Sequence, residues 1–485
     1  MTRGVPATPS RTPRPPRTGR RLFTAGLAGV LCTVLLAPST ARATSTPTQV
    51  TSAVTSGVAY LKTLQRADGG FAGAGLSNEW AFSAFAAAGV AVVDLTPGGD
   101  TSRDARTVYR GLLADPAWPG AAPVATDYQR AVLNTYAAGI DPARVSAGRN
   151  LIADVASYWQ PTEPGYWGPS GLFNGTIFGL LALAGAKTST GARRVPQRLL
   201  DASISVVRAN QHTDGGWNFG KAEGNPSQLA ATSDIDMTGA ALAALCSGGV
   251  PNTDAAVQAG KNFLKRKLVN ASGAFTALFG PNANSNGWAV SGLNACGFPS
   301  QGTEFTTTAG KTPVDFLRTL QVLPGGGFRY QPSSTGATAY PSIDAVRALA
   351  GGGFTAAPPT PVTAGTPRWV ASTGFTPGQA STVAVVVDAG TSTGLRVCAV
   401  RVTPTGATTT LGAVLDAAAG GAAAPAGCVT GHAPASGGGT VTSINGVGNT
   451  GGTSWRFGVD GGAEAPANRD SVVNLGDTVS LRYGS

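Results

Sequence analysis

The chain has 485 residues; 42% are hydrophobic and 7% aromatic, and 35 Lys and Arg stand against 25 Asp and Glu. Seven of the arginines lie within residues 1–43, which contain no acidic residue, so the rest of the chain has a net charge of only +3. Because no basic stripe remains outside this segment, the composition argues against nucleic acid as a partner.

Residues 1–43 have the features of a secretory signal peptide. A basic stretch is followed by an apolar run at 22–36 and by Ala-Arg-Ala at 41–43, a small-x-small cleavage site. The run is too short to span a bilayer, so an integral membrane protein is not expected. The arginine pair at 20–21 resembles a twin-arginine export signal, with the general secretory route as the alternative. We therefore predict a secreted protein, and the Ala-rich, Lys-poor composition favours a bacterial source.

A repeated pattern organises residues 50–355. In each copy an amphipathic helix ends in Gln, and a Gly-rich turn then delivers an aromatic residue. Two good copies and a looser third are Gln65 with Gly69, Gly70 and Phe71; Gln211 with Gly215, Gly216 and Trp217; and Gln321 with Gly325, Gly326, Gly327 and Phe328. Glycine supplies the positive φ that ends such a helix. The pattern predicts helical hairpins.

A second helix, rich in Ala and Leu, is expected after each turn. Six such helices start at polar capping types, near Glu79, Asp127, Asn174, Asp236, Asn286 and Ser342. Less regular first helices fill the gaps at 105–113, 150–159 and 257–268. Six pairs suit a closed ring with the first helices outside and the second helices inside. We predict an α6/α6 barrel.

The Gln-xxx-Gly-x-aromatic pattern resembles the QW repeat of the terpene cyclase and protein prenyltransferase toroid superfamily. The resemblance covers about 300 residues and implies the α/α toroid, whose members include cyclases, prenyltransferases and binding proteins. It therefore says more about the fold than about the function.

The sequence period changes from 3.6 to 2 after a Pro- and Thr-rich linker at 356–367. Strand-like runs follow at 381–387, 395–402 and 478–483, separated by Gly- and Ala-rich turns. We expect a helical domain over 44–355 and a small, mostly β domain over 368–485.

Three segments of this second domain, at 443–447, 451–461 and 473–483, resemble the C-terminal β domain of the transcobalamin and intrinsic factor family. The run Asp-Met-Thr-Gly-Ala-Ala-Leu from Asp236 resembles the barrel helices of that family. The resemblance implies an α6/α6 barrel joined to the β domain, and a secreted binding protein that holds cobalamin or another corrinoid between them. No required cofactor is expected beyond this possible ligand, and no metal-binding residues are expected in the chain.

The resemblance places the ligand where the N-termini of the inner helices face the β domain. By position, the residues expected to touch it are Asp127, Asn174, Asp236, Asn286, Trp455 and Phe457. For Trp455 an ordinary core role is the alternative, because most strand aromatics pack. For Asp234 and Asp236 the alternative is a pair that caps the helix.

Four cysteines remain after the leader: Cys246, Cys296, Cys398 and Cys428. They form no CxxC pair, and only two histidines accompany them, so a zinc site is poorly supported. An even number of cysteines in a secreted chain favours disulfides. We expect Cys246–Cys296 and Cys398–Cys428, one in each domain; the other pairings would join the domains.

The strongest enzymatic alternative is a class II terpene cyclase of the squalene–hopene type. Such enzymes protonate an alkene with the middle Asp of an Asp-x-Asp-Asp motif at the start of an inner helix. Asp234 and Asp236 stand in that context, and Asp236 would be the acid. Met237 occupies the fourth position, however, and aromatic residues that would stabilise carbocations are scarce.

Two other enzyme classes receive less support. A protein prenyltransferase needs zinc bound by Asp, Cys and His, and His212 is expected in a solvated turn without a partner cysteine. A glycosidase needs convergent carboxylates, and only Glu79 stands at the start of an inner helix, where it serves equally well as a cap. We predict a binding protein with a small-molecule ligand. No sequence feature specifies an oligomeric state.

Overall fold

The computed structural model describes residues 44–71, 76–372, 378–390 and 394–485, with the backbone alone for 76–79. The predicted signal peptide lies outside the described residues. Within them, no helix is long and apolar enough to cross a membrane.

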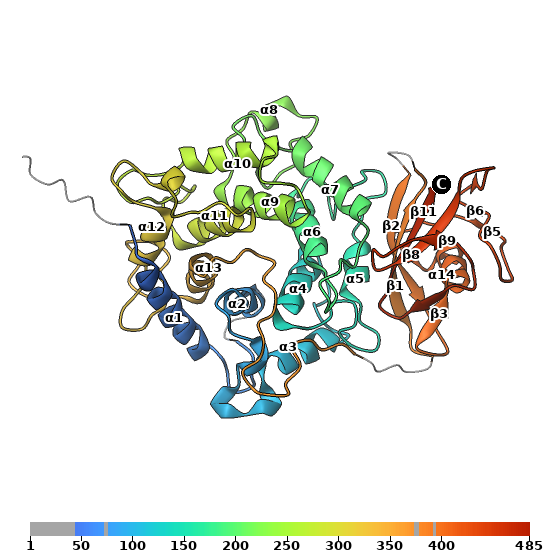
Figure 1. The fold of residues 1–485 in the computed structure, drawn as a ribbon, viewed down its shortest axis with the longest axis horizontal. Coiled ribbons are helices and arrows are strands. Elements are labelled where there is room, and N and C mark those ends of the chain that lie inside the picture. The colour runs from blue at the N-terminus through green and yellow to red at the C-terminus, as the bar shows by residue number, and fades with distance from the viewer. Residues whose placement is uncertain (1–43, 72–75, 373–377, 391–393) are drawn as a thin grey trace, which may run out of the picture. The chain divides into compact units, whose positions relative to one another are not determined.

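Twelve helices of the described region form the six predicted hairpins (Figure 1). The outer helices are α1 (Pro47–Thr63), α3 (Ala105–Ala114), α5 (Leu151–Ala156), α7 (Gln197–Ala209), α10 (Ala255–Arg266) and α12 (Pro313–Thr319). The inner helices are α2 (Leu76–Ala87), α4 (Ala125–Ala138), α6 (Asn174–Gly185), α9 (Ile235–Ser247), α11 (Ala283–Ala295) and α13 (Ala339–Leu349). A short helix, α8 (Pro226–Leu229), lies in the loop before α9.

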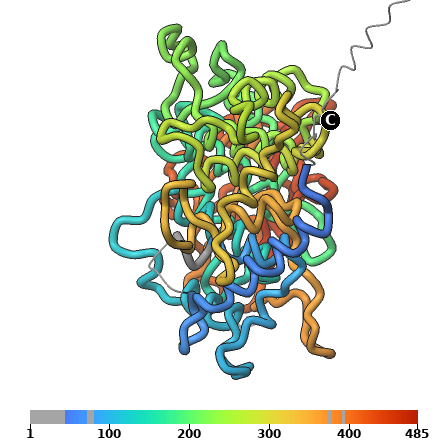
Figure 2. Tube along the Cα trace, turned by 90° about the vertical axis from the view of Figure 1, so that its left-hand side faces the viewer, coloured from blue at the N-terminus to red at the C-terminus, as the bar shows by residue number. Residues whose placement is uncertain are grey.

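The inner helices close into a ring. Each contacts the next, and α13 contacts α2; on the outside α1 contacts α12 and α13, so the first and last hairpins lie side by side (Figures 1 and 2). Small residues permit the close approach: a Cβ added at Gly292 of α11 would come within 2.3 Å of the Gly239 carbonyl oxygen of α9. The predicted α6/α6 toroid is confirmed.

The repeated glutamines explain why the pattern recurs. Gln211 Nε2 donates to the carbonyl of Gly215 in its own turn at 2.7 Å and to that of Ala256, at the start of the next outer helix, at 2.8 Å. Gln65 and Gln321 make the equivalent pairs of bonds. Each Gln therefore ties one hairpin to the next, and Gln321 reaches Ala53 of α1 to close the ring.

The strands form a six-stranded sheet in the order β4-β2-β1-β11-β8-β9, in which β1 and β11 are parallel. The bounds are β1 (Ser381–Asp388), β2 (Leu395–Val402), β4 (Ala423–Ala424), β8 (Ser454–Val459), β9 (Ala465–Pro466) and β11 (Thr478–Gly484). Helix α14 (Leu411–Ala417) covers one face, and the strand pairs β3 (Thr408–Thr410) with β10 (Val472–Asn474) and β5 (His432–Ala433) with β6 (Ser443–Ile444) and β7 (Val447–Gly448) complete the domain.

Strand β1 is buried on both faces, which explains its nearly unbroken apolar run. Val383, Val385 and Val387 belong to the core of the β domain, whereas Ala384 and Val386 belong to the barrel core. The sheet packs by this second face on the outer helix α5.

Ion pairs flank the apolar contact between sheet and barrel. Arg194 is only 2% exposed and bridges Asp141 of the barrel to Asp460 of the sheet domain. Arg144 pairs with Asp477 at 2.8 Å. These barrel residues follow the C-terminal ends of α4 and α6. The expectation that the β domain faces the N-termini of the inner helices is therefore wrong, because the apolar face of the sheet is matched by α5 on the outer wall.

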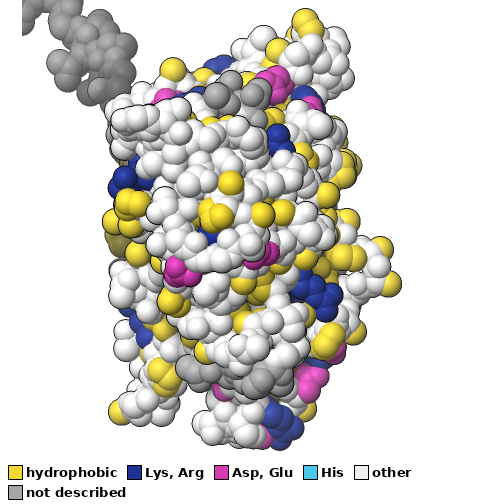
Figure 3. All heavy atoms as spheres, turned by 90° about the vertical axis from the view of Figure 1, so that its right-hand side faces the viewer, with side chains coloured by type: hydrophobic (Ala, Val, Ile, Leu, Met, Phe, Trp, Pro, Cys, Tyr) yellow, Lys and Arg dark blue, Asp and Glu magenta, His cyan; other side chains and the backbone are white. Residues whose placement is uncertain are grey.

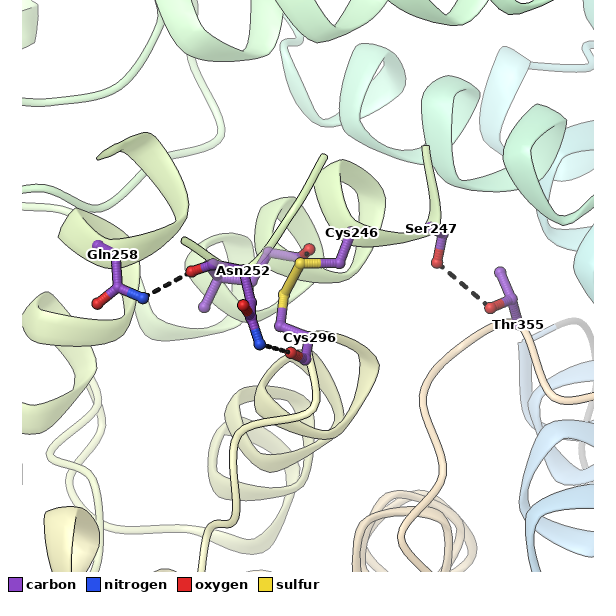
Figure 4. Close-up of a disulfide and its surroundings, with 7 residues drawn as sticks. Cys246, Ser247, Asn252, Gln258, Cys296 and Thr355 are labelled. Atoms are coloured by element: carbon purple, nitrogen blue, oxygen red, sulfur yellow. Dashed lines mark hydrogen bonds between the residues drawn. A yellow bond between two sulfur atoms is a disulfide. The ribbon is translucent and has the colours of Figure 1, made fainter. Parts of the chain in front are cut away.

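Both predicted disulfides are confirmed. Cys246, in the last turn of α9, joins Cys296, which follows α11, across an S–S distance of 2.05 Å (Figure 4). Asn252 donates to the Cys296 carbonyl at 3.2 Å and holds the intervening loop against this end of the barrel. Cys398 joins Cys428 within the β domain. A bridge closing a loop of such length contributes about 2–4 kcal/mol.

On the face that Figure 3 shows, the visible Lys and Arg lie in small separate groups between acidic and hydrophobic side chains. No broad basic patch appears among the described residues of this face. The expectation that nucleic acid is not a partner stays a prediction.

Candidate ligand-binding cavity

A cavity of about 230 Å³ lies at the N-terminal ends of the inner helices. Five inner helices and one loop contribute its lining: Trp80 (α2), Thr126 and Arg130 (α4), Asn174 and Phe178 (α6), Asp236 and Met237 (α9), Trp288 (α11), and Phe219 from the loop before α9. Helix N-termini accommodate polar side chains because their first N–H groups lack helical partners. The same turns therefore supply polar groups to a mostly apolar hollow.

Three aromatic rings form a contiguous wall of the cavity. The ring centroids of Trp80 and Phe178 are 6.2 Å apart, those of Trp80 and Trp288 6.1 Å, and those of Phe178 and Trp288 5.7 Å. Behind them lies Phe354, fully buried, 5.8 Å from Trp80 and 5.2 Å from Trp288. The site thus holds a cluster of four mutually packed rings.

Asp236 is the distinctive polar group of the cavity. Its Oδ1 atom is buried and has no hydrogen-bond partner among the described residues. Burial, followed by the negative charge of Asp234, raises the pKa of Asp236 to about 7; a hydrogen bond from Ser285 acts in the opposite direction. A buried carboxylate oxygen without a partner costs free energy, so Oδ1 can accept a hydrogen bond from a ligand.

Asp234 has a different role. It is the N-cap of α9, and its Oδ1 accepts the Met237 N–H at 2.9 Å. Burial raises the pKa of the Asp234 carboxyl as well. The capping interpretation therefore describes Asp234, while the Asp236 side chain turns to the cavity.

A buried ion pair lies beneath the aromatic wall. Arg347 of α13 is completely buried and donates to Asp344 at 2.6 Å and to Ser291 at 3.1 Å. Its guanidinium carbon lies 4.4 Å from the Phe354 ring centroid and 5.7 Å from that of Trp80. Burial raises the pKa of the Asp344 carboxyl although Arg347 opposes this. Asp344 is also a further negative influence on Asp236.

The six ligand residues expected from the sequence divide into two groups. Asn174 and Asp236 line the cavity together. Asp127 lies beside it, because it pairs at 3.1 Å with Arg130, a lining residue, and also accepts the Val124 N–H at 3.0 Å.

The other three expected residues lie elsewhere. Asn286 is fully buried, and its side chain accepts the Phe275 N–H at 2.7 Å and donates to the Asn282 carbonyl at 2.9 Å. Trp455 is 1% exposed in the core of the β domain, where its Nε1 donates to the Val447 carbonyl at 2.8 Å. Phe457 packs against the same core. Ligand contact by these three residues stays a prediction.

The structure gives no support to His212 as a zinc ligand or to Glu79 as a catalytic carboxylate. His212 is buried rather than solvated, and its Nδ1 bonds the Ala231 carbonyl at 2.8 Å, so that expectation is wrong. Within the described part of the chain, no group of three or more His, Cys, Asp and Glu could hold a metal ion. The side chain of Glu79 lies outside the described residues.

A larger cleft of about 570 Å³ separates α7 from the edge of the β domain. Arg198, Asp201, Glu223 and Asp388 supply its charges. Arg198 is already paired, at 3.2 Å with Asp388 and at 2.8 Å with Glu464. This cleft carries charged side chains and lies outside the ring, in contrast to the aromatic cavity.

The aromatic wall was not anticipated from the sequence. Its signal is a single aromatic residue in a helix that has no other ring, as with Phe178 in α6 and Trp288 in α11. From the sequence alone, such an aromatic side chain is interpreted as a core residue. Its place in a cavity wall is recognised only once the inner helices are arranged around a hollow centre.

No family model and no curated protein matches the chain. Among solved structures, the apo type II terpene cyclase MstE from Scytonema is 13% identical, with 63% of this chain and 98% of that chain covered and a TM-score of 0.43. Haptocorrin in complex with Cbi is 13% identical, with 89% and 97% covered and a TM-score of 0.35. Candida albicans protein geranylgeranyltransferase-I is 15% identical, with 47% and 66% covered and a TM-score of 0.35. Both families that the sequence resembles are thus represented, but with TM-scores below 0.5 these similarities say nothing about activity or ligand.

Proposed function

We propose that the protein binds a small, mainly apolar organic molecule in the cavity at the N-terminal ends of the inner helices, with Asp236 as its polar anchor. The observation that carries the proposal is the Asp236 Oδ1 atom, buried without a partner among the described residues next to three aromatic rings. A ligand that donates a hydrogen bond to this atom removes a penalty of about 1–3 kcal/mol.

The chemistry of the cavity favours an amine or alcohol as the anchored group. Asp234 and Asp344 both raise the pKa of Asp236, so a cation or a neutral donor relieves their repulsion, whereas an anion adds to it. The faces of aromatic rings also attract cations. An alkyl or aryl amine with its ammonium group on Asp236 satisfies both conditions.

The volume limits the size of this ligand. At about 230 Å³ the cavity lies below the range of about 300–1,000 Å³ typical of sites for drug-sized molecules. A corrinoid is far too large for it. The cleft of about 570 Å³ beside α7 is the place that a corrinoid would have to use, and there Arg198 is already paired with Asp388 and Glu464.

Acid catalysis in the manner of a class II terpene cyclase is the second candidate. Its supporting observation is the pKa of Asp236 near 7, which leaves a large protonated fraction at neutral pH beside rings able to stabilise a cation. Against it stand the small volume, which does not hold a long polyprene, and Met237, whose buried side chain occupies the fourth position of the acid motif.

Titration calorimetry on residues 44–485 with n-butylamine, n-butanol and butyrate tests the proposal. We expect affinity to fall in that order, and Asp236→Asn to weaken amine binding by about 1–3 kcal/mol. Asp254→Asn is the matched control, because it changes the N-cap of outer helix α10 and Asn caps as well as Asp.

Two outcomes would contradict the proposal. If butyrate bound more tightly than butylamine and butanol, the Asp236 carboxylate could not be the anchor. Cyclised product from squalene that disappears in Asp236→Asn would replace the binding function with the catalytic one.

A further inference from the structure

A groove lies next to the inner cavity and shares a wall with it. Its volume is about 380 Å³, and it runs between the loop before α9 and the loop before α11. Phe219 lines both hollows. Asp234 lines the groove and Asp236 the cavity, so the two hollows lie on either side of the first turn of α9.

Large apolar side chains are exposed around this groove. Leu278 is 84% exposed, Phe279 73%, Leu172 61% and Phe219 48%. A backbone bridge between Leu172 and Gly220 holds Leu172 next to the Phe219 loop. Exposed apolar residues that gather in one place mark a binding surface more often than single ones do.

The lining of the groove is partly apolar and partly polar. Phe219, Ala277 and Leu278 supply apolar surface, whereas Asn218, Thr232 and Lys267 are polar. Such a half-open groove suits a flexible hydrocarbon chain that keeps one side towards water. It suits a rigid apolar polycycle less well, because that would need cover on all sides.

We infer that the ligand is a single-chain amphiphile, with its amine or alcohol head on Asp236 in the cavity and its alkyl tail crossing Phe219 into the groove against Leu278. This inference rests on the proposed function and adds the substrate class. The shared Phe219 wall carries it: the cavity alone is too small for more than a short chain, and the groove on the other side of Phe219 is lined by the exposed Leu278.

A homologous series of n-alkylamines from butyl to dodecyl, kept below their critical micelle concentrations, tests the inference by titration calorimetry. Burial of one methylene is worth about 0.8 kcal/mol, which corresponds to about a fourfold gain in affinity. We expect this gain to continue beyond the length that fills the cavity and to stop where the groove ends.

Two variants, Leu278→Ser and Leu278→Ser with Phe279→Ser, distinguish binding of the alkyl tail from binding of the head group. Both should flatten the gain for the long amines while butylamine binding stays within about twofold, because neither residue lines the inner cavity. Val362→Ser is the matched control: Val362 is 87% exposed, but it lies in the linker next to Asp94, beyond the C-terminal end of α2.

The outcomes are distinguishable. A chain-length dependence that is the same in wild type and both groove variants would overturn the inference and leave the cavity proposal standing. Failure of butylamine to bind, or butylamine binding insensitive to Asp236→Asn, would overturn the proposed function and the inference together. Equal weakening of every amine in a groove variant with an unchanged melting temperature would also contradict a tail-only contact.

Discussion

The two ends of the helical ring differ in how they are closed. At the C-terminal end, hydrogen bonds satisfy carbonyls at the helix ends: Val370, just beyond the linker, donates to the Gly139 carbonyl at 2.8 Å, and Asn294 of α11 donates to the Ala348 and Gly352 carbonyls at 3.0 and 3.2 Å. Phe354 fills the centre from this side. At the N-terminal end, the cavity and the Asp236 carboxyl remain. The six parallel inner helices are thus stabilised at one end and open to a ligand at the other.

This difference shows that the linker packs against the barrel and forms hydrogen bonds with it. Its Pro- and Thr-rich composition predicts a spacer, but the Val362 N–H donates to Asp94 at 3.0 Å and Arg106 donates to the Pro367 carbonyl at 2.7 Å. The connection to the β domain therefore packs against α3 and the segment after α2 before it reaches the sheet.

Of the substitutions that test this comparison, Phe354→Ala should have the largest effect on stability. The side chain is fully buried between Trp80, Trp288 and Arg347, so its removal should lower the free energy of unfolding by about 3–5 kcal/mol. Denaturant unfolding of the oxidised protein measures the change. A loss below about 1 kcal/mol would show that the closed end does not depend on this plug.

The pH dependence of stability should distinguish the open end. The usual pKa of an aspartate, 3.8, is raised to about 7 for Asp236 in the folded protein, so folding is favoured by the protonated form. This stability is fully present below pH 4 and is lost as pH rises through 7. At about 1.4 kcal/mol per pKa unit, the wild type should lose on the order of 2–4 kcal/mol.

Asp236→Asn should remove this dependence. The variant should match the wild type near pH 4 and exceed it in stability at pH 8, as measured by unfolding at both values. Parallel curves for wild type and variant would mean that Asp236 is ionised in the folded protein, and the cavity would then lack its poised carboxyl.

Much of the fold could be predicted from the sequence because the repeated residues make the same structural contacts in each copy. The Gln, Gly and aromatic spacing encodes the bond from Gln211 to two carbonyls, and the six inner helices start where polar capping types precede Ala- and Leu-rich runs. The disulfides followed from the cysteine count and from the two domains.

The sequence did not predict which helix the β domain packs on, and it did not predict the aromatic wall of the cavity. The apolar run of β1 predicts burial on both faces, but nothing in it specifies α5 as the partner. Trp80, Phe178 and Trp288 are far apart in sequence, and each alone is a reasonable core residue; only ring closure brings them together around a hollow. Sequence position likewise placed Asn286 and Asp236 in equivalent turns, although one bonds the backbone and the other faces the cavity.

Phe219→Ala is the mirror of Phe354→Ala and has the smallest expected effect on stability. Phe219 is 48% exposed at the mouth of the cavity, so its truncation should change the free energy of unfolding by no more than about 0.5 kcal/mol. It should nevertheless weaken butylamine binding, because it removes apolar surface from the cavity wall. The same substitution at the two ends then separates the two roles: stability at the closed end and ligand contact at the open one. A stability loss equal to that of Phe354→Ala would show that the open end is packed like the closed end, and the contrast between them would fail.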